Sequence, residues 1–186
     1  MAQTQAFQQA VQHLADRDRE NLRQGRCVVV QSQNRHQGFI LIDADQETLW
    51  EVITDYENFP SFLPTVIEAR VVEDEGDRKL VEQVDEREVL FTTVTSRIQT
   101  ENVETPPHQV SFQMTEGDLT RFQGCWQAIA ASTESDRPTL LLQTVAAEAG
   151  VGPLEMVFDQ VLERSLKENL ESISRETDRR CRLTPD

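Results

Sequence analysis

Apolar residues recur every three to four positions from about residue 152 to residue 180, and this spacing predicts one long amphipathic helix. Gly152 and Pro153 mark its expected start, because glycine interrupts the preceding segment and proline suits a first helical turn. The apolar stripe consists of Leu154, Val157, Phe158, Val161, Leu162, Leu166, Leu170 and Ile173. A helix with a stripe of this length needs an extended apolar surface to cover.

Upstream of this helix the pattern changes to alternation of apolar and polar residues, which indicates β-strands. Two strand signals come first, at 27–30 and 38–42, and two short helices are predicted over 45–63. Further strands are predicted over 65–73, 78–84, 89–100, 109–115, 119–131 and 139–147, with a turn expected at 85–88. Turns about every ten residues are typical of an antiparallel meander.

Runs of strands followed by a single helix predict an α+β fold. We expect a curved antiparallel sheet of about seven strands wrapped around the long C-terminal helix, with the two short helices closing one end. A weakly amphipathic helix over 4–24 would lie against this domain. The expected organisation is an accessory helix at 1–25, one domain at 26–180 and a short tail at 181–186.

Composition narrows the classes of partner. The 186 residues carry a net charge of −15, which disfavours non-specific binding to nucleic acid or to anionic membranes. The three cysteines are far apart and the three histidines are isolated, so we expect neither a disulfide framework nor a metal or other cofactor. The chain has no leader-like segment and no apolar run long enough for a membrane span. A cytoplasmic protein without stable membrane insertion is expected.

One predicted strand has a face that combines aromatic with very small residues. Phe122, Gly124, Trp126, Ala128 and Ala130 alternate along it. The small residues could leave room that the aromatic rings line, or the strand could bend sharply within a fully packed core. The sequence leaves both interpretations open.

The ordered segments Asp43–Trp50, Thr54–Pro60, Phe62–Pro64, Gly117–Leu119 and Gly124–Trp126, followed by the long helix, resemble START-like helix-grip proteins, the SRPBCC superfamily. The most similar branch is the polyketide cyclase/dehydrase and coenzyme Q-binding group, in particular small cyanobacterial and plastid members. The resemblance covers residues 26–180. It implies that a hydrophobic ligand is held between the sheet and the terminal helix.

Together, the apolar pattern and the resemblance give a set of candidate ligand-cavity residues: Phe59, Phe62, Leu63, Phe112, Met114, Phe122, Trp126, Leu142, Leu154, Phe158 and Leu162. Tyr56 and Arg97 are candidate polar anchors, although packing at the end of the first short helix is the preferred explanation for Tyr56 and an ordinary sheet-face charge is the preferred one for Arg97. The segment Phe59–Pro64 is expected at the cavity entrance, because it is rich in both proline and apolar residues.

A cluster of carboxylates, Glu82, Asp85, Glu86 and Glu88, is interpreted as solvated faces and a turn; a paired acid/base site would need two of them inside the cavity. No catalytic residue is assigned. Three functions stay open: binding or transport of a lipid, quinone, isoprenoid or pigment-like molecule; an aromatase/cyclase-type enzyme acting on a polyketide-like substrate; and an assembly factor acting through its surface. A protein partner or a weak homodimer is compatible with each.

Overall fold

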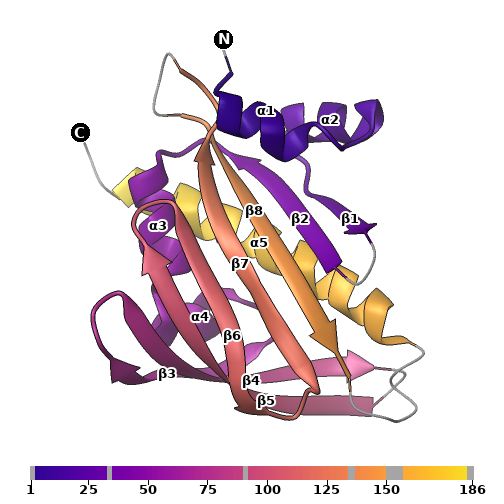
Figure 1. The fold of residues 1–186 in the computed structure, drawn as a ribbon, viewed down its shortest axis with the longest axis vertical. Helices are drawn as coiled ribbons and strands as arrows, with labels where there is room; N and C mark the ends of the chain where they lie inside the picture. The colour runs from indigo at the N-terminus through magenta and orange to yellow at the C-terminus, as the bar shows by residue number, and fades with distance from the viewer. Residues whose placement is uncertain (1–2, 33–34, 90–91, 134–136, 150–156, 184–186) are drawn as a thin grey trace.

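The computed structural model describes residues 3–32, 35–89, 92–133, 137–149 and 157–183. In these residues eight strands form one antiparallel sheet in the order β1-β2-β8-β7-β6-β5-β4-β3 (Figure 1). The strands are β1 (Val28–Ser32), β2 (Arg35–Ile42), β3 (Val66–Asp74), β4 (Arg78–Val89), β5 (Thr92–Thr105), β6 (Gln109–Gly117), β7 (Arg121–Ala130) and β8 (Thr139–Glu148). The predicted α+β class and antiparallel meander are therefore confirmed, with eight strands rather than about seven.

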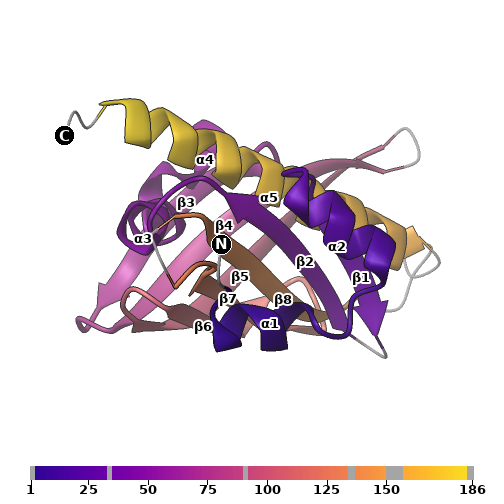
Figure 2. The ribbon, with the colours of Figure 1, turned by 90° about the horizontal axis from the view of Figure 1, so that it is seen from above.

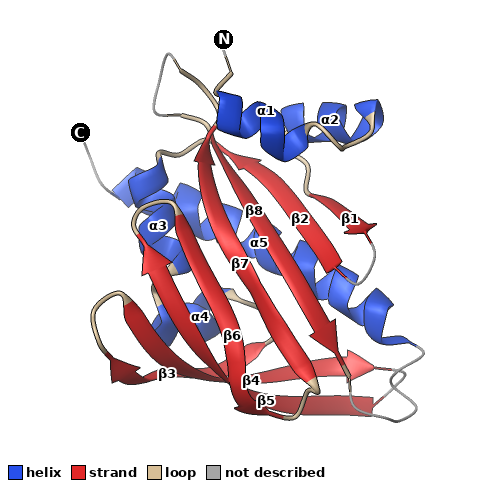
Figure 3. Cartoon of the chain, viewed as in Figure 1, coloured by secondary structure: helices blue, strands red, loops and turns tan. Residues whose placement is uncertain are grey.

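Helices lie on both faces of this sheet. They are α1 (Gln5–Val11), α2 (Asp16–Arg23), α3 (Gln46–Ile53), the 3-10 helix η1 (Tyr56–Asn58), α4 (Phe59–Phe62) and α5 (Phe158–Leu183). The long helix α5 runs diagonally across one face, and α1 lies on the opposite side (Figures 2 and 3). The expected start of the long helix at Gly152 and Pro153 lies outside the described residues. Its end at Leu183 reaches into the segment expected to be a tail.

The predicted turn at 85–88 is wrong, because β4 continues through it. Paired with β5 from Arg78↔Val103 to Val89↔Thr92, this strand buries Asp85 and exposes Glu86 and Glu88. The side chains keep the period of two that a strand requires. A run of charges resembled a turn because charged residues are typical of solvated loops, yet here half of them face the interior.

The predicted N-terminal helix over 4–24 is two helices, separated near Ala15. Phe7, Val11 and Leu14 are buried against Phe39 and Leu142 on the face of the sheet away from α5. This second apolar layer explains why β8 is buried on both faces. The proposed domain division at residue 25 stays a prediction.

The C-terminal half of α5 packs directly on the sheet and on α3. Leu170 and Ile173 are buried in a core with Ile40, Leu49 and Leu141. The end of the helix is held by Arg180, whose Nη2 lies 2.6 Å from Asp55 Oδ2 and whose Nη1 donates to the Glu51 carbonyl.

Gly124 allows close packing and does not add the space that was one of the two interpretations of the sequence. A Cβ at this position would lie 1.9 Å from the Thr144 carbonyl oxygen and 2.8 Å from Phe112 Cζ. Both distances are shorter than van der Waals contact, and the nearer atom belongs to the backbone. The missing side chain therefore lets β7 approach its neighbours closely.

We expect Gly124→Ala to lower the free energy of unfolding by about 3 kcal/mol, the upper part of the range for overpacking, because backbone must move. Gly38→Ala is the matched control. A Cβ there would meet only side-chain atoms, Leu170 Cδ1 at 2.4 Å and Leu166 Cδ2 at 3.7 Å, and no backbone. Denaturant unfolding of both variants tests this. An equal loss in the two would contradict the backbone clash.

The last turns of α5 also make the free energy of unfolding depend on pH. Glu176 accepts hydrogen bonds from Arg179 and Arg180, and the bond from Arg179 is the main cause that lowers the pKa of Glu176 to about 2. A carboxylate with a lowered pKa contributes stability above its unfolded pKa, here the ordinary 4.5, and loses that contribution as the pH falls toward 2.

Glu176→Gln should therefore reduce the free energy of unfolding at neutral pH, and its deficit relative to the unmodified protein should shrink from about pH 4.5 downward. Glu168→Gln is the control, because Glu168 pairs with Arg164 on the exposed face of the same helix and such pairs contribute little. Chemical denaturation at several pH values measures both. A deficit for Glu176→Gln that is independent of pH would be the contrary result.

Candidate functional site

A cavity of about 470 Å³ lies between the sheet and the N-terminal half of α5. Its wall is built from the inward faces of β4 to β8, from one side of α5, and from Tyr56, Phe59 and Leu63 at the end closed by η1 and α4. The volume falls within the range of about 300–1,000 Å³ that is usual for small-molecule sites.

The wall is mainly apolar. Phe112 and Phe122 stack with ring centroids 5.1 Å apart, and Trp126 lies on the same strand face as Phe122. From the helix, Phe158 and Leu162 face these rings. Aromatic rings from the sheet and from α5 thus line opposite sides of the cavity, and this lining suits an apolar molecule.

Of the residues expected at the cavity, the structure brings eight into its wall: Tyr56, Phe59, Leu63, Phe112, Phe122, Trp126, Phe158 and Leu162. Leu154 lies outside the described residues. The other four occupy different places. Leu142 points to the opposite face of the sheet and packs with Phe7 and Val11, because it is one residue out of phase with Gln143 and Val145.

The structure also places the remaining three residues outside the described cavity wall. Phe62 is half-buried and packs edge-on against the far side of Phe59, with ring centroids 5.7 Å apart. Met114 is half-buried opposite Thr100, beside an irregularity in the β5–β6 ladder. Arg97 is exposed, so it offers no anchor inside the cavity.

The expected entrance at Phe59–Pro64 is also placed differently. Phe59 and Leu63 are buried and form the inner end of the cavity. Among the described residues of the wall, Thr95 on β5 and Asp118 in the turn after β6 are exposed. Asp118 is held there by its Oδ2, which accepts a hydrogen bond from the Arg97 backbone N–H at 2.7 Å. The cavity therefore reaches solvent beside this turn.

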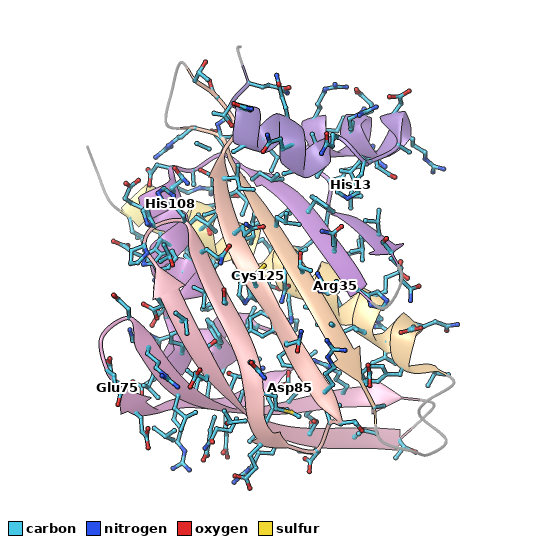
Figure 4. The ribbon with its side chains drawn as sticks, viewed as in Figure 1. His13, Arg35, Glu75, Asp85, His108 and Cys125 are labelled. Carbon is cyan, nitrogen blue, oxygen red and sulfur yellow. The ribbon has the colours of Figure 1, made fainter. Side chains whose placement is uncertain are left out.

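Strand β4 contributes two charged side chains to the described part of the cavity wall, Asp85 and Arg87. Asp85, labelled in Figure 4, is buried and lines the cavity. Its carboxylate accepts hydrogen bonds from Thr65 Oγ1 at 3.1 Å, Gln83 Nε2 at 2.8 Å and Arg87 Nη2 at 3.2 Å. The other carboxylates of the predicted cluster do not belong to the wall. The pair that an acid/base site would need is therefore not assembled from this cluster.

Three polar atoms of the wall are buried without a hydrogen-bond partner among the described residues: Arg87 Nε, Gln143 Oε1 and Asn169 Oδ1. The sequence reasoning missed all three residues. Arg87 was hidden by the predicted turn. Asn169 lies seven residues after Leu162 and so on the apolar stripe, which is the signal that could have revealed it.

At the inner end, the Tyr56 hydroxyl donates to Glu104 Oε1 at 2.9 Å, and Lys79 Nζ lies 3.2 Å from Glu104 Oε2. Burial, followed by the nearby Glu104 charge, raises the pKa of Tyr56. The Tyr56 hydroxyl therefore keeps its proton and donates it in the hydrogen bond to Glu104, and the ring of this neutral phenol lines the cavity.

The described residues give no further reactive constellation. Across them, no three His, Cys, Asp or Glu side chains are grouped so that they could hold a metal ion. None of the helices in the described part of the chain is both long and apolar enough to span a bilayer. The expected cytoplasmic location stays a prediction.

The curved sheet gripping a long helix, with a lined space between them, defines a START-like helix-grip fold. The chain belongs to the polyketide cyclase/dehydrase and lipid transport family, whose sequence profile matches residues 42–174. A comparison with curated proteins gives no match.

Solved structures share the fold at low sequence identity. The Zhui aromatase/cyclase from a Streptomyces species has a TM-score of 0.68 and 15% identity, covering 79% of this chain and 94% of that one. A START superfamily protein from Mycobacterium smegmatis has a TM-score of 0.67 and 13% identity, with 82% and 100% covered. A STAR-related lipid transfer protein from Xanthomonas axonopodis has a TM-score of 0.60 and 9% identity, with 82% and 98% covered.

Two alanines on the sheet separate cavity from core. Ala147 lines the cavity, whereas Ala128 is buried in the core beside Leu49 and Leu141 and is absent from the wall. We expect Ala147→Phe to change the free energy of unfolding by less than about 1 kcal/mol, because its ring can enter open space. Ala128→Phe should cost about 1–3 kcal/mol through overpacking. Thermal and denaturant unfolding compare the pair. Equal losses would argue against a space beside Ala147.

Proposed function

We propose that this protein binds a hydrophobic small molecule in the cavity between its sheet and α5. The observation that supports this most strongly is the cavity wall itself, in which Trp126, Phe122 and Phe112 face Phe158 and Leu162 across a volume of about 470 Å³. A space of this size lined by apolar side chains gains free energy when an apolar ligand leaves water. The family and the neighbouring structures agree with this use of the fold.

The range of ligands is the one expected from the resemblance: a lipid, a quinone such as coenzyme Q, an isoprenoid or a pigment-like molecule. Transport would follow if the same ligand could leave beside Thr95 and Asp118, where the wall meets solvent. A partner protein, a weak homodimer and an assembly role stay predictions that no contact on the described surface tests.

A second candidate, a cyclase-type enzyme, is favoured by one observation. The Asp85–Arg87 pair lies in a mainly apolar cavity wall, where an oriented charge pair acts more strongly than in water. Such a pair could fix one conformation of a flexible poly-carbonyl chain, and positioning alone contributes much of the rate in a cyclisation. The structure of the Zhui aromatase/cyclase makes this comparison relevant.

Binding can be measured with N-phenyl-1-naphthylamine, an uncharged dye whose fluorescence rises in apolar surroundings. We expect saturable binding that Ala147→Phe weakens by about tenfold or more, because the new ring occupies the dye's space. Val103→Phe is the control, since Val103 is 45% exposed and does not belong to the wall. No saturable binding, or equal weakening by both variants, would overturn the proposal.

Native mass spectrometry of the protein from its own host, followed by organic extraction, would identify a retained ligand. Recovery of an unchanged apolar compound supports the binding function. Conversion of a supplied poly-carbonyl compound, lost in Asp85→Asn while dye binding persists, would instead favour the enzyme.

A further inference from the structure

The cavity contains polar atoms that the protein itself leaves without partners. Gln143 is only 6% exposed, its side chain belongs to the cavity wall, and its Oε1 has no hydrogen-bond partner among the described residues. Asn169 Oδ1 and Arg87 Nε are also buried atoms without a hydrogen-bond partner among the described residues. Nearly all buried polar groups in folded proteins have partners, and one that lacks a partner destabilises the protein. Three such atoms on one cavity wall therefore indicate that something in the cavity supplies their hydrogen bonds.

Their placement divides them into two groups. Gln143 lies in the middle of β8, opposite Trp126 on β7 and Gly38 on β2. Asn169 precedes Leu170, whose side chain lies so close to Gly38 that a Cβ there would come within 2.4 Å of it. Both amides therefore belong to the inner region where α5 descends onto the sheet. Arg87 lies on β4, separated from β8 by three strands in the sheet order.

The chemistry of the three side chains restricts the ligand. A carboxamide offers an acceptor oxygen and a donor N–H₂, and rotation by half a turn exchanges them. Arg87 Nε can only donate. As placed, Gln143 Oε1 and Asn169 Oδ1 are acceptors that need a donor from the ligand, whereas Arg87 Nε needs an acceptor. A hydroxyl oxygen meets both needs, and a carbonyl oxygen meets those of Arg87 and of an amide turned by half a turn. A pure hydrocarbon would leave all three atoms without partners.

The charges of the wall act against an anionic ligand. Its described charged side chains are Arg87, Asp85 and Asp118. The guanidinium is already paired with Asp85 at 3.2 Å, and the second carboxylate stands at the mouth. A carboxylate or phosphate entering the cavity would meet a wall with one more negative than positive charge. Losing its hydration there would not be offset by an unpaired cation.

We infer that the cavity selects an uncharged ligand that carries hydroxyl or carbonyl oxygen, and that Gln143 and Asn169 are the specificity-determining residues that recognise this oxygen. This inference rests on the proposed binding function and narrows its ligand class. It sets fatty acids and anionic phospholipids apart from alcohols, ketones and quinone-like molecules of similar apolar size.

The test uses displacement of N-phenyl-1-naphthylamine by three compounds of equal chain length: decane, decan-1-ol and decanoate, at about pH 8, where the acid is ionised. Gln143→Leu and Asn169→Leu should each weaken decan-1-ol by about five- to tenfold, the effect of one lost hydrogen bond. Both substitutions should leave the affinity for decane unchanged or increase it. Gln123→Leu is the matched control, because Gln123 lies on the neighbouring strand β7 in a groove on the outer face, with Cys125 and Thr144.

Thermal melting of the ligand-free proteins provides a second readout. Gln143→Leu should melt at the same or a higher temperature, because it removes a buried polar atom without a partner. A lower melting temperature would show that Gln143 has a structural role instead. If Gln143→Leu folds poorly, the displacement measurements can still be made with Asn169→Leu.

The charge argument has its own measurement. Decan-1-ol should bind about tenfold or more tightly than decanoate, and Asp85→Asn should narrow that ratio by several-fold, because it removes the buried wall carboxylate. If Asp85→Asn leaves the ratio of the two affinities unchanged, partitioning of the ligands from water alone sets that ratio. This result would overturn the proposed selection against anions.

The outcomes separate this inference from the function on which it rests. If neither the dye nor any of the three compounds binds, the proposed binding function fails. If they bind but neither amide variant weakens decan-1-ol more than the Gln123→Leu control, the function stands and the inference on Gln143 and Asn169 fails. The same holds if decanoate is the tightest ligand, since an anion would then be preferred.

Discussion

The contact between α5 and the sheet is the constraint on which the rest of the structure depends. At its C-terminal half the helix lies against β2 and α3, where Leu170 fills the space left by Gly38 and Arg180 ties the last turns to Asp55. Along its N-terminal half the helix and strands β4 to β8 line the cavity of about 470 Å³. One straight helix on a curved sheet cannot touch every strand, because a helix is a rod and a twisted sheet is not flat. The cavity is the space that this mismatch leaves.

This space has an energetic consequence. Phe158 and Leu162 pack with Phe112 and Val145 but also border the open cavity, so they contribute less dispersion energy than side chains surrounded by atoms on all sides. Stability is supplied elsewhere, by the buried cluster around Leu49 and Ile173 and by the second apolar layer under α1. The protein thus separates a packed half that maintains the fold from an open half that can accept a molecule. A ligand that fills the open half would stabilise the folded state by mass action.

The polar atoms of the wall give the cavity its individuality within a fold that serves many functions. The fold supplies the cavity between the sheet and α5. The distribution of Asp85, Arg87, Gln143 and Asn169 on its wall is a property of this chain. Such groups are costly in an empty cavity and useful in an occupied one, because an unsatisfied partner discriminates strongly between ligands that can and cannot pair with it. In the function proposed above, specificity would therefore depend on a few polar atoms and not on the apolar walls.

The sequence by itself determined the class of fold, the antiparallel meander and the amphipathic character of the last helix, because helix and strand periods are local properties. The apolar pattern together with the family resemblance also indicated Trp126 and Phe158 as cavity residues, and both lie in the cavity wall. Only the tertiary structure decided which apolar face is which. Leu142 and Val145 are both buried, yet one faces α1 and the other the cavity.

The same limit explains the polar residues. Along β4 a period of two assigns Asp85 and Arg87 to one face, but only the pairing of that strand with β5 turns this face inward, since a shift of one residue would exchange the two faces. The entrance beside Asp118 depends on where the turn after β6 meets solvent, which no local pattern records. Local periodicity thus fixes which residues share a face, and long-range strand pairing and helix packing decide what that face contacts.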